Sequence, residues 1–256
     1  MRNEICLTGE REGLVIRDCL AKLTRFCQHD AFPCYDIVGY KHVLDPDRLQ
    51  SELLTATNSA MRARSSTKAW EPFLNKPLSV LADVPTDVDL VEASDAAYAS
   101  AREKLRGCYL VLTNAKWITD MAASKMLYLK RPRLVAISDS YVREALAVGQ
   151  PDSKLYPWRA PYHAARGLMV ADAVRAVGRA NLGALADLQQ AMSPVLDDLG
   201  KTHGVRAWVS KARLVDILIW GEMAIDRDKR DKGWGDVVEK QGWSSVVRDI
   251  RARTAK

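Results

Sequence analysis

The stretch WITDMAASKMLYLKRPRLVAISDSYVR, residues 117–143, decides the expected fold because a proline separates two helical patterns within it. Helical spacing of apolar residues over 113–131 predicts one helix, or two short helices with a turn near Thr119 and Asp120. Pro132 ends this pattern, since proline has no amide hydrogen for a helical bond and disfavours helical geometry in the preceding residue. The stretch therefore predicts a break between two helices.

A second helix follows the break. The run LVAI, residues 134–137, reads as a short extended connector, and the next helix ends at Gly149. Its N-cap is expected at one of three polar residues, Ser138, Asp139 or Ser140.

Helical spacing continues on both sides of this stretch, and alternation typical of strands is rare. We therefore expect an all-α fold and a single mainly helical unit over residues 1–256, with a core at about 45–150 and a C-terminal helical part at about 160–256 packed on it. The further expected helices lie at 13–26, from Asp45 and Pro46 onward, at 94–105, 164–190, 192–199 and 210–225, and after a charged turn at 226–236.

The hydrophobic fraction and the positive net charge are compatible with a folded protein that binds a polyanion. The 256 residues are 48% hydrophobic, which allows a real core, and 38 Lys and Arg against 32 Asp and Glu give a net charge of +6 and a pI near 9.1. This excess is compatible with nucleic acid but is too mild to establish it.

The cysteines give no sign of a metal site, and we expect neither a metal nor another cofactor. No pair has the C-x-x-C spacing of a zinc site, and reduced thiols in a cytoplasm are the expected state. The charged N-terminus and the shortness of the apolar runs predict a cytoplasmic chain with no signal peptide and no membrane partner. The five cysteines are Cys6, Cys19, Cys27, Cys34 and Cys108.

Basic residues crowd the deciding stretch and are candidates for phosphate contacts. Such contacts neutralise DNA phosphates and make affinity salt-sensitive. The alternative is a solvated helix C-terminus, where the macrodipole favours cations such as Lys130 and Arg131. The candidates are Lys125, Lys130, Arg131, Arg133 and Arg143.

Asp139 also has two interpretations. It can simply cap the helix that follows. A carboxylate at a helix N-terminus is stabilised in its charged form by backbone amides, so it also suits stabilising a developing cation or orienting a water molecule.

The stretch resembles the helix-hairpin-helix DNA glycosylase superfamily, which includes endonuclease III and adenine glycosylase. That family has a hairpin of the form G-x-G-x-K-T-A and, after a helix and a short extended piece, D-[TS]-[HY]-[VI]-x-R; this chain has WITDMAA at 117–123 and DSYVR at 139–143. The interval from Met121, at the family's lysine position, to Asp139 matches the family's interval from lysine to catalytic aspartate. The run 123–134 is also similar to an uncharacterised bacterial family of unknown function.

The resemblance covers about residues 52–147 and implies a glycosylase-like helical fold with added N- and C-terminal helices. It implies that Asp139 is the catalytic carboxylate and that DNA is the partner. Residues 52–67 are similar to the superfamily's first core helix, whose end presses into DNA near the flipped base. The pocket-side candidates in that region are Asn58, Arg62 and Arg64, for which a solvated helix end is the alternative.

The chain departs from the family's pattern at the hairpin. Trp117 and Thr119 replace the glycines that let backbone amides approach a phosphate, and a bulky residue is expected to block that approach. Met121 replaces the lysine, which excludes Schiff-base chemistry at that position. The resulting hypothesis is a DNA-binding protein, as a divergent monofunctional glycosylase, and the alternative is a non-catalytic helical DNA-binding or protein-interaction module.

Two weaker candidates lie farther along. The loop before the 164–190 helix mixes aromatic and basic residues, including Tyr162 and His163, and could either stack bases or pack onto the core. GKTHG at 200–204 is similar to the end of a phosphate-binding loop, but Val195 stands where that motif needs glycine and no strand precedes it.

Overall fold

The structure is a computed structural model that describes residues 4–7, 15–28, 32, 35, 36, 45–51, 53, 54, 57, 65–149 and 160–231, with only the backbone for 224–231. The described part is mostly helical, with one small two-stranded sheet. Its elements are β1 (Glu4–Cys6), β2 (Val15–Arg17), α1 (Cys19–Gln28), α4 (Thr67–Trp70), α5 (Ser79–Ala82), α6 (Asp95–Thr113), α7 (Asp120–Tyr128), α8 (Ser140–Ala145), α9 (Ala160–Ala180), α10 (Leu182–His203) and α11 (Lys211–Asp231).

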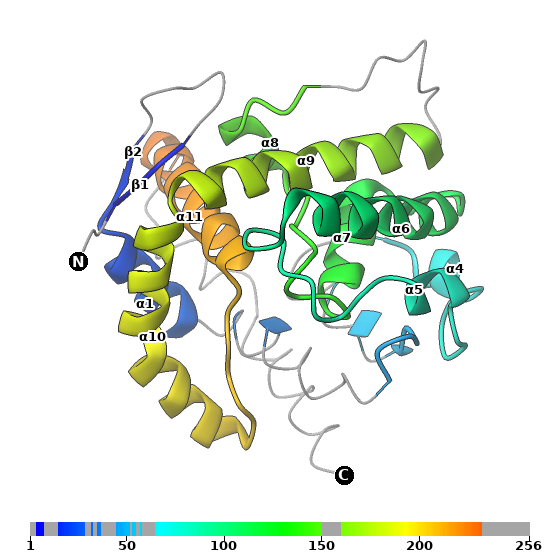
Figure 1. Ribbon diagram of the computed structural model, residues 1–256, viewed down its shortest axis with the longest axis horizontal. Coiled ribbons are helices and arrows are strands. Elements are labelled where there is room, and N and C mark those ends of the chain that lie inside the picture. The colour runs from blue at the N-terminus through cyan, green and yellow to red at the C-terminus, as the bar shows by residue number, and fades with distance from the viewer. Residues whose placement is uncertain are drawn as a thin grey trace.

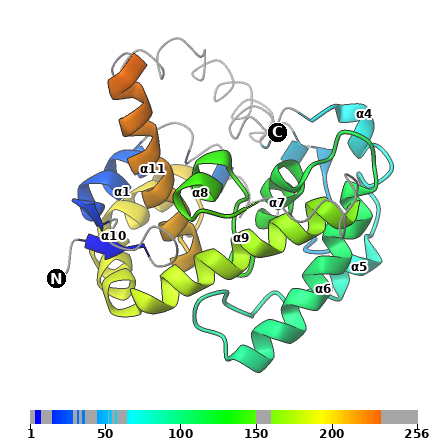
Figure 2. The same cartoon turned by 90° about the horizontal axis from the view of Figure 1, so that it is seen from above.

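The helices form two groups that α9 joins (Figure 1). α1, α10 and α11 pack on one another beside the sheet, and α5, α6 and α7 pack at the other end. α9 runs along α6 and α7 and also contacts α11, as the view from above shows (Figure 2). α8 packs on α11, so the two helices of the deciding stretch are held by different neighbours.

The N-terminal sheet corrects the helix expected at 13–26. Val15–Arg17 is a strand that pairs antiparallel with Glu4–Cys6, with Ile5 opposite Ile16. Both isoleucines are fully buried, and Asp18, at φ 54°, turns the chain into α1. Each strand has only three residues, so long-range pairing rather than local alternation defines it.

The helix boundaries in the C-terminal half also differ from the expected ones. The chain breaks at Asn181 rather than near residue 191, because the Asn181 side chain is bound to β1: Cys6 N donates to Oδ1 at 2.9 Å, and Nδ2 donates to the Cys6 carbonyl at 2.7 Å. α11 continues to Asp231, through the first part of the charged turn expected at 226–236. The helix expected from Asp45 starts later, since 45–47 form a turn and Arg48 and Leu49 form bridges to Pro77 and Leu74.

Three other boundaries follow the prediction. Ser94 caps α6, Asp139 is the one of the three candidate residues that caps α8, and a turn before Thr119 separates α6 from α7, as the second of the two alternatives had it. The predicted ends are wrong for two of these helices, since α6 continues to Thr113 rather than 105 and α8 ends at Ala145 rather than Gly149. The predicted break near Pro132 is also present, although α7 itself ends at Tyr128.

One hydrophobic cluster runs through both groups of helices, from Ile5 to Ile219. α9 lies so close to α6 that a Cβ added at Gly167 would lie 2.8 Å from the Tyr109 ring. No described helix combines the length and the apolar character that crossing a bilayer requires.

Candidate nucleic-acid interface and carboxylate site

The turn between α6 and α7 projects a tryptophan into solvent. Trp117 is 69% exposed and has φ 77°, while the next residue, Ile118, is buried and its amide donates to the Ala115 carbonyl at 3.2 Å. The Lys116 ammonium lies over the indole, 5.0 Å from the ring centroid. Thr119 then starts α7 by accepting from the Ala122 amide at 3.4 Å. The hairpin therefore has an anchored base and an exposed aromatic tip.

Asp120, the first residue of α7, is fully buried and collects donors from three other parts of the chain. The Ser138 hydroxyl donates to Oδ2 at 2.6 Å, and Arg143 Nη1 lies 3.3 Å from the same oxygen. On the other oxygen, His163 Nδ1 lies at 3.0 Å, and Arg166 Nη2 also donates to it. This carboxylate fixes the positions of α8 and α9 relative to the hairpin.

The charge on Asp120 is strongly favoured. Burial alone would raise the pKa of the Asp120 carboxyl, but hydrogen bonds from His163, Arg166 and Ser138 outweigh burial and hold the pKa well below its usual range. Because the side chains of Arg143 and Arg166 are both partly accessible, Asp120 holds two cations at the edge of the surface.

Asp139 lies where α7 and α8 meet and is 19% exposed in its side chain. Its Oδ1 accepts from the Tyr141 amide at 3.0 Å, which makes it the N-cap of α8. Its Oδ2 lies 3.3 Å from the ammonium of Lys125, a residue of α7. Both carboxylate oxygens thus have contacts within the fold, and the side chain still reaches the surface.

Lys125 is therefore not a surface cation. Its side chain is buried; burial lowers the pKa of the ammonium and the facing Asp139 carboxylate opposes that effect. Lys125 supports the Asp139 carboxylate from within the fold, and the prediction that Lys125 contacts phosphates is therefore wrong.

Lys130 and Arg131 are also corrected, because both are buried, with 2% and 1% exposure. Lys130 donates to the Asp45 carbonyl and to Gln50, and burial lowers the pKa of Lys130 to about 8. Arg131 donates to the carbonyls of Pro46, Leu81 and Val84 and pairs with Asp47 at 2.8 Å. Lys130 and Arg131 join the end of α7 to the segments at 45–50 and 81–84. They therefore form neither a phosphate-binding surface nor a solvated helix end.

The other predicted contacts divide in two. Arg133 and Arg143 keep part of their side chains accessible, Arg133 near Asp89 at 3.7 Å and over the Trp208 ring. Asn58, Arg62 and Arg64 lie outside the residues that the structure describes.

Behind Asp139, α11 supplies a buried polar support. Asp216 Oδ2 accepts from the Ile137 amide at 3.1 Å, and burial raises the pKa of Asp216 to about 7. Deeper still, Arg213 pairs with Asp36 at 2.9 Å and 3.0 Å, and the Tyr128 hydroxyl donates to Asp36 at 2.8 Å. The segment that carries Asp139 is thus held to α11 by a hydrogen bond from its main chain.

Sequence reasoning missed Asp120, Lys116 and Arg166. The spacing of His163 and Arg166 places both on one face of α9, which was a usable signal for a polar group there. Nothing local marks Asp120 as their partner, because its donors come from residues 138 to 166.

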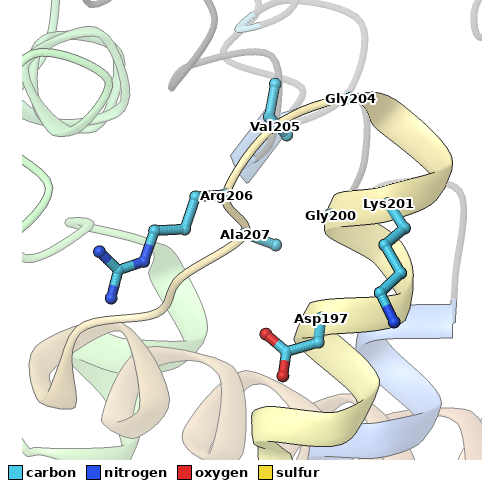
Figure 3. Close-up of a pocket in the computed structure, with 7 residues that line it drawn as sticks. All are labelled: Asp197, Gly200, Lys201, Gly204, Val205, Arg206 and Ala207. Carbon is cyan, nitrogen blue, oxygen red and sulfur yellow. The ribbon is translucent and has the colours of Figure 1, made fainter.

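A separate pocket of about 520 Å³ lies at the end of α10, between Asp197, Lys201 and the return at 204–207 (Figure 3). Gly200, Lys201 and Gly204 of the GKTHG segment line it, and Gly204, at φ 64°, ends the helix there. None of the residues around Asp120 or Asp139 lines it. Among the described residues, no group of three His, Cys, Asp or Glu side chains could hold a metal ion.

Comparison with known proteins gives one family match. Residues 30–223 match the model of DUF6308, described as a family of unknown function. No curated protein and no solved structure matches the chain.

Proposed function

The chain belongs to the DUF6308 family, whose function is unknown, and we propose from its geometry that it binds DNA and acts as a divergent monofunctional DNA glycosylase with Asp139 as the catalytic carboxylate. The observation that carries the proposal is the order of two features along the chain: the hairpin between α6 and α7 comes first, and after α7 follows the partly exposed Asp139, which caps α8. This is the order that the resemblance to helix-hairpin-helix glycosylases implies.

A carboxylate suits the hydrolysis of an N-glycosidic bond for an electrostatic reason. As the bond from C1′ of the deoxyribose to the base nitrogen breaks, positive charge develops on the sugar, and a nearby carboxylate stabilises it. Water then bonds to C1′ through its oxygen and gives one proton to Asp139, while the departing base takes a proton from solvent; Asp139 afterwards returns its proton to solvent. The base has to leave the helical stack before this step.

The phosphate contacts in this proposal come from residues at the surface. Lys116 on the hairpin tip is exposed, and Arg143 and Arg133 are partly accessible. Each contact of this kind releases counterions and adds salt-sensitive affinity without reading sequence. The buried Lys125 does not contact DNA in this proposal; its ammonium holds the Asp139 carboxylate in position.

The test is an incubation of the protein with duplex and single-stranded DNA that carries a panel of damaged and modified bases, scored for abasic sites. We expect product with the wild type and none with Asp139→Asn, because asparagine still caps α8 but carries no charge. Asp87→Asn makes the same change at an exposed position and should retain activity. Product from Asp139→Asn at the wild-type rate would refute the assignment.

A non-catalytic DNA-binding module is the second candidate, and the contacts of Asp139 favour it. Capping α8 and facing Lys125 are sufficient structural roles for this side chain. On this alternative neither protein yields abasic sites, and salt-sensitive DNA binding is unchanged by Asp139→Asn. Absence of DNA binding at low salt would point to a protein partner instead.

A further inference from the structure

The backbone of Trp117 has a conformation that costs free energy and that glycine would adopt without strain. Its φ of 77° lies in the left-handed region, where the Cβ of a bulky residue is crowded by the backbone. Strain of this kind persists where the surrounding fold enforces it, and it concentrates at binding sites.

The indole stabilises little of the fold in return. Trp117 is 69% exposed, whereas Trp70, on α4, is fully buried and donates to the Ser65 hydroxyl at 2.8 Å. The turn is anchored by the neighbouring Ile118, which is 2% exposed. A large aromatic side chain that is both strained and solvent-facing suits a ligand better than a core.

The charges around the ring indicate the ligand. Lys116 places its ammonium over the indole, 5.0 Å from the centroid, and so brings a cation to the same spot as a flat apolar surface. Three residues after Trp117, Asp120 holds Arg143 and Arg166 at the other end of the turn. A flat group linked to an anion fits this pattern, and a nucleotide has both a planar base and a phosphate.

We propose that the tip of the α6–α7 hairpin is a base-stacking site, in which Trp117 stacks on a nucleobase that is not paired in a duplex and Lys116 meets its phosphate. This inference rests on the proposed DNA binding and adds a preference for unpaired or single-stranded positions. Stacking is tolerant of base identity because every base has a π face, so the site selects an unstacked base rather than a sequence.

The experiment compares three fluorescently labelled oligonucleotides of equal length by anisotropy: a single strand, a perfect duplex and a duplex with one bulged base. The full chain is titrated as wild type and as Trp117→Gly, Trp117→Phe and Leu182→Ala. Leu182, at the start of α10, is another exposed large apolar residue, at 41%, and controls for loss of exposed apolar surface.

We expect Trp117→Gly to weaken binding of the single strand and the bulged duplex by roughly 5- to 150-fold and to change perfect-duplex binding by less than about twofold. Trp117→Phe should keep most of the affinity, and Leu182→Ala should keep all of it. Because glycine relieves the strain at φ 77°, the melting temperature of Trp117→Gly should not fall, which separates lost stacking from lost folding.

Two results would overturn the inference alone: unchanged single-strand and bulge binding in Trp117→Gly, or an equal loss on all three oligonucleotides. Failure of the wild type to bind any of the three would overturn the proposed function along with it.

Discussion

Replacing Asp120 with asparagine perturbs the residue on which the candidate site is organised. Asparagine keeps the shape of the side chain and one carbonyl acceptor but removes the negative charge from a fully buried position. Arg143, His163 and Arg166 then lose the carboxylate that faces them, and the Ser138 hydroxyl loses a charged acceptor. The contacts that hold α8 and α9 to the start of α7 all weaken together.

The expected loss is large because the carboxylate is buried. Removing one partner of a buried charge pair costs roughly 3–5 kcal/mol. Asp95→Asn is a matched control, since Asp95 is also the first residue of its helix and also pairs with two arginines, Arg175 and Arg179, but is 83% exposed. Solvent screens that group, so its loss should be several-fold smaller.

The assay is urea unfolding followed by circular dichroism, with the free energy of unfolding obtained from the midpoint and slope. Hydrogen bonds hold the pKa of Asp120 below its usual value in the folded state. Its stabilisation is therefore present above the unfolded pKa near 3.9 and is lost as the pH falls below it. The difference in the free energy of unfolding between the wild type and Asp120→Asn should be largest near neutral pH and should become smaller in acid. Equal losses for Asp120→Asn and Asp95→Asn, or a gap that widens in acid, would refute the reasoning.

Two further predictions concern the packing around the site. Burial raises the pKa of Asp216 to about 7, so the contribution of Asp216 to the free energy of unfolding should fall as the pH rises from about 4 to 7. Asp216→Asn should flatten that dependence. At alkaline pH the variant should exceed the wild type in free energy of unfolding by at most roughly 4 kcal/mol, since each pKa unit is worth about 1.4 kcal/mol. Identical pH profiles of the wild type and the variant in thermal melts would contradict this prediction. Gly167→Ala should cost about 1–3 kcal/mol, because its Cβ would meet the Tyr109 ring at 2.8 Å. Gly183→Ala, with nothing within 4 Å, should be neutral or slightly stabilising, and similar urea midpoints for the two variants would disprove the clash.

Local chemistry was enough to predict the start of several helices. Ser94 and Asp139 each have a side-chain oxygen next to a helical pattern, and each caps the helix that follows. Such caps depend on residues within a few positions, which is why the sequence is informative there.

Features set by distant contacts could not be predicted in the same way. The end of α9 depends on Asn181 binding Cys6, which is 175 residues away. Lys130 and Arg131 resemble an exposed basic helix end in the sequence, but the segment at 45–50 covers them. In the sequence Asp120 indicates at most a turn between two short helices, and only the fold brings α9 to it.

The most direct test of the proposed function is the salt dependence of DNA affinity. The logarithm of the binding constant for a perfect duplex should fall linearly with the logarithm of salt concentration. Lys116→Gln should reduce the magnitude of that slope by about 1, whereas Lys201→Gln, an exposed lysine at the far pocket on α10, should leave it unchanged. Absence of binding at low salt, or equal effects of the two variants, would contradict the account.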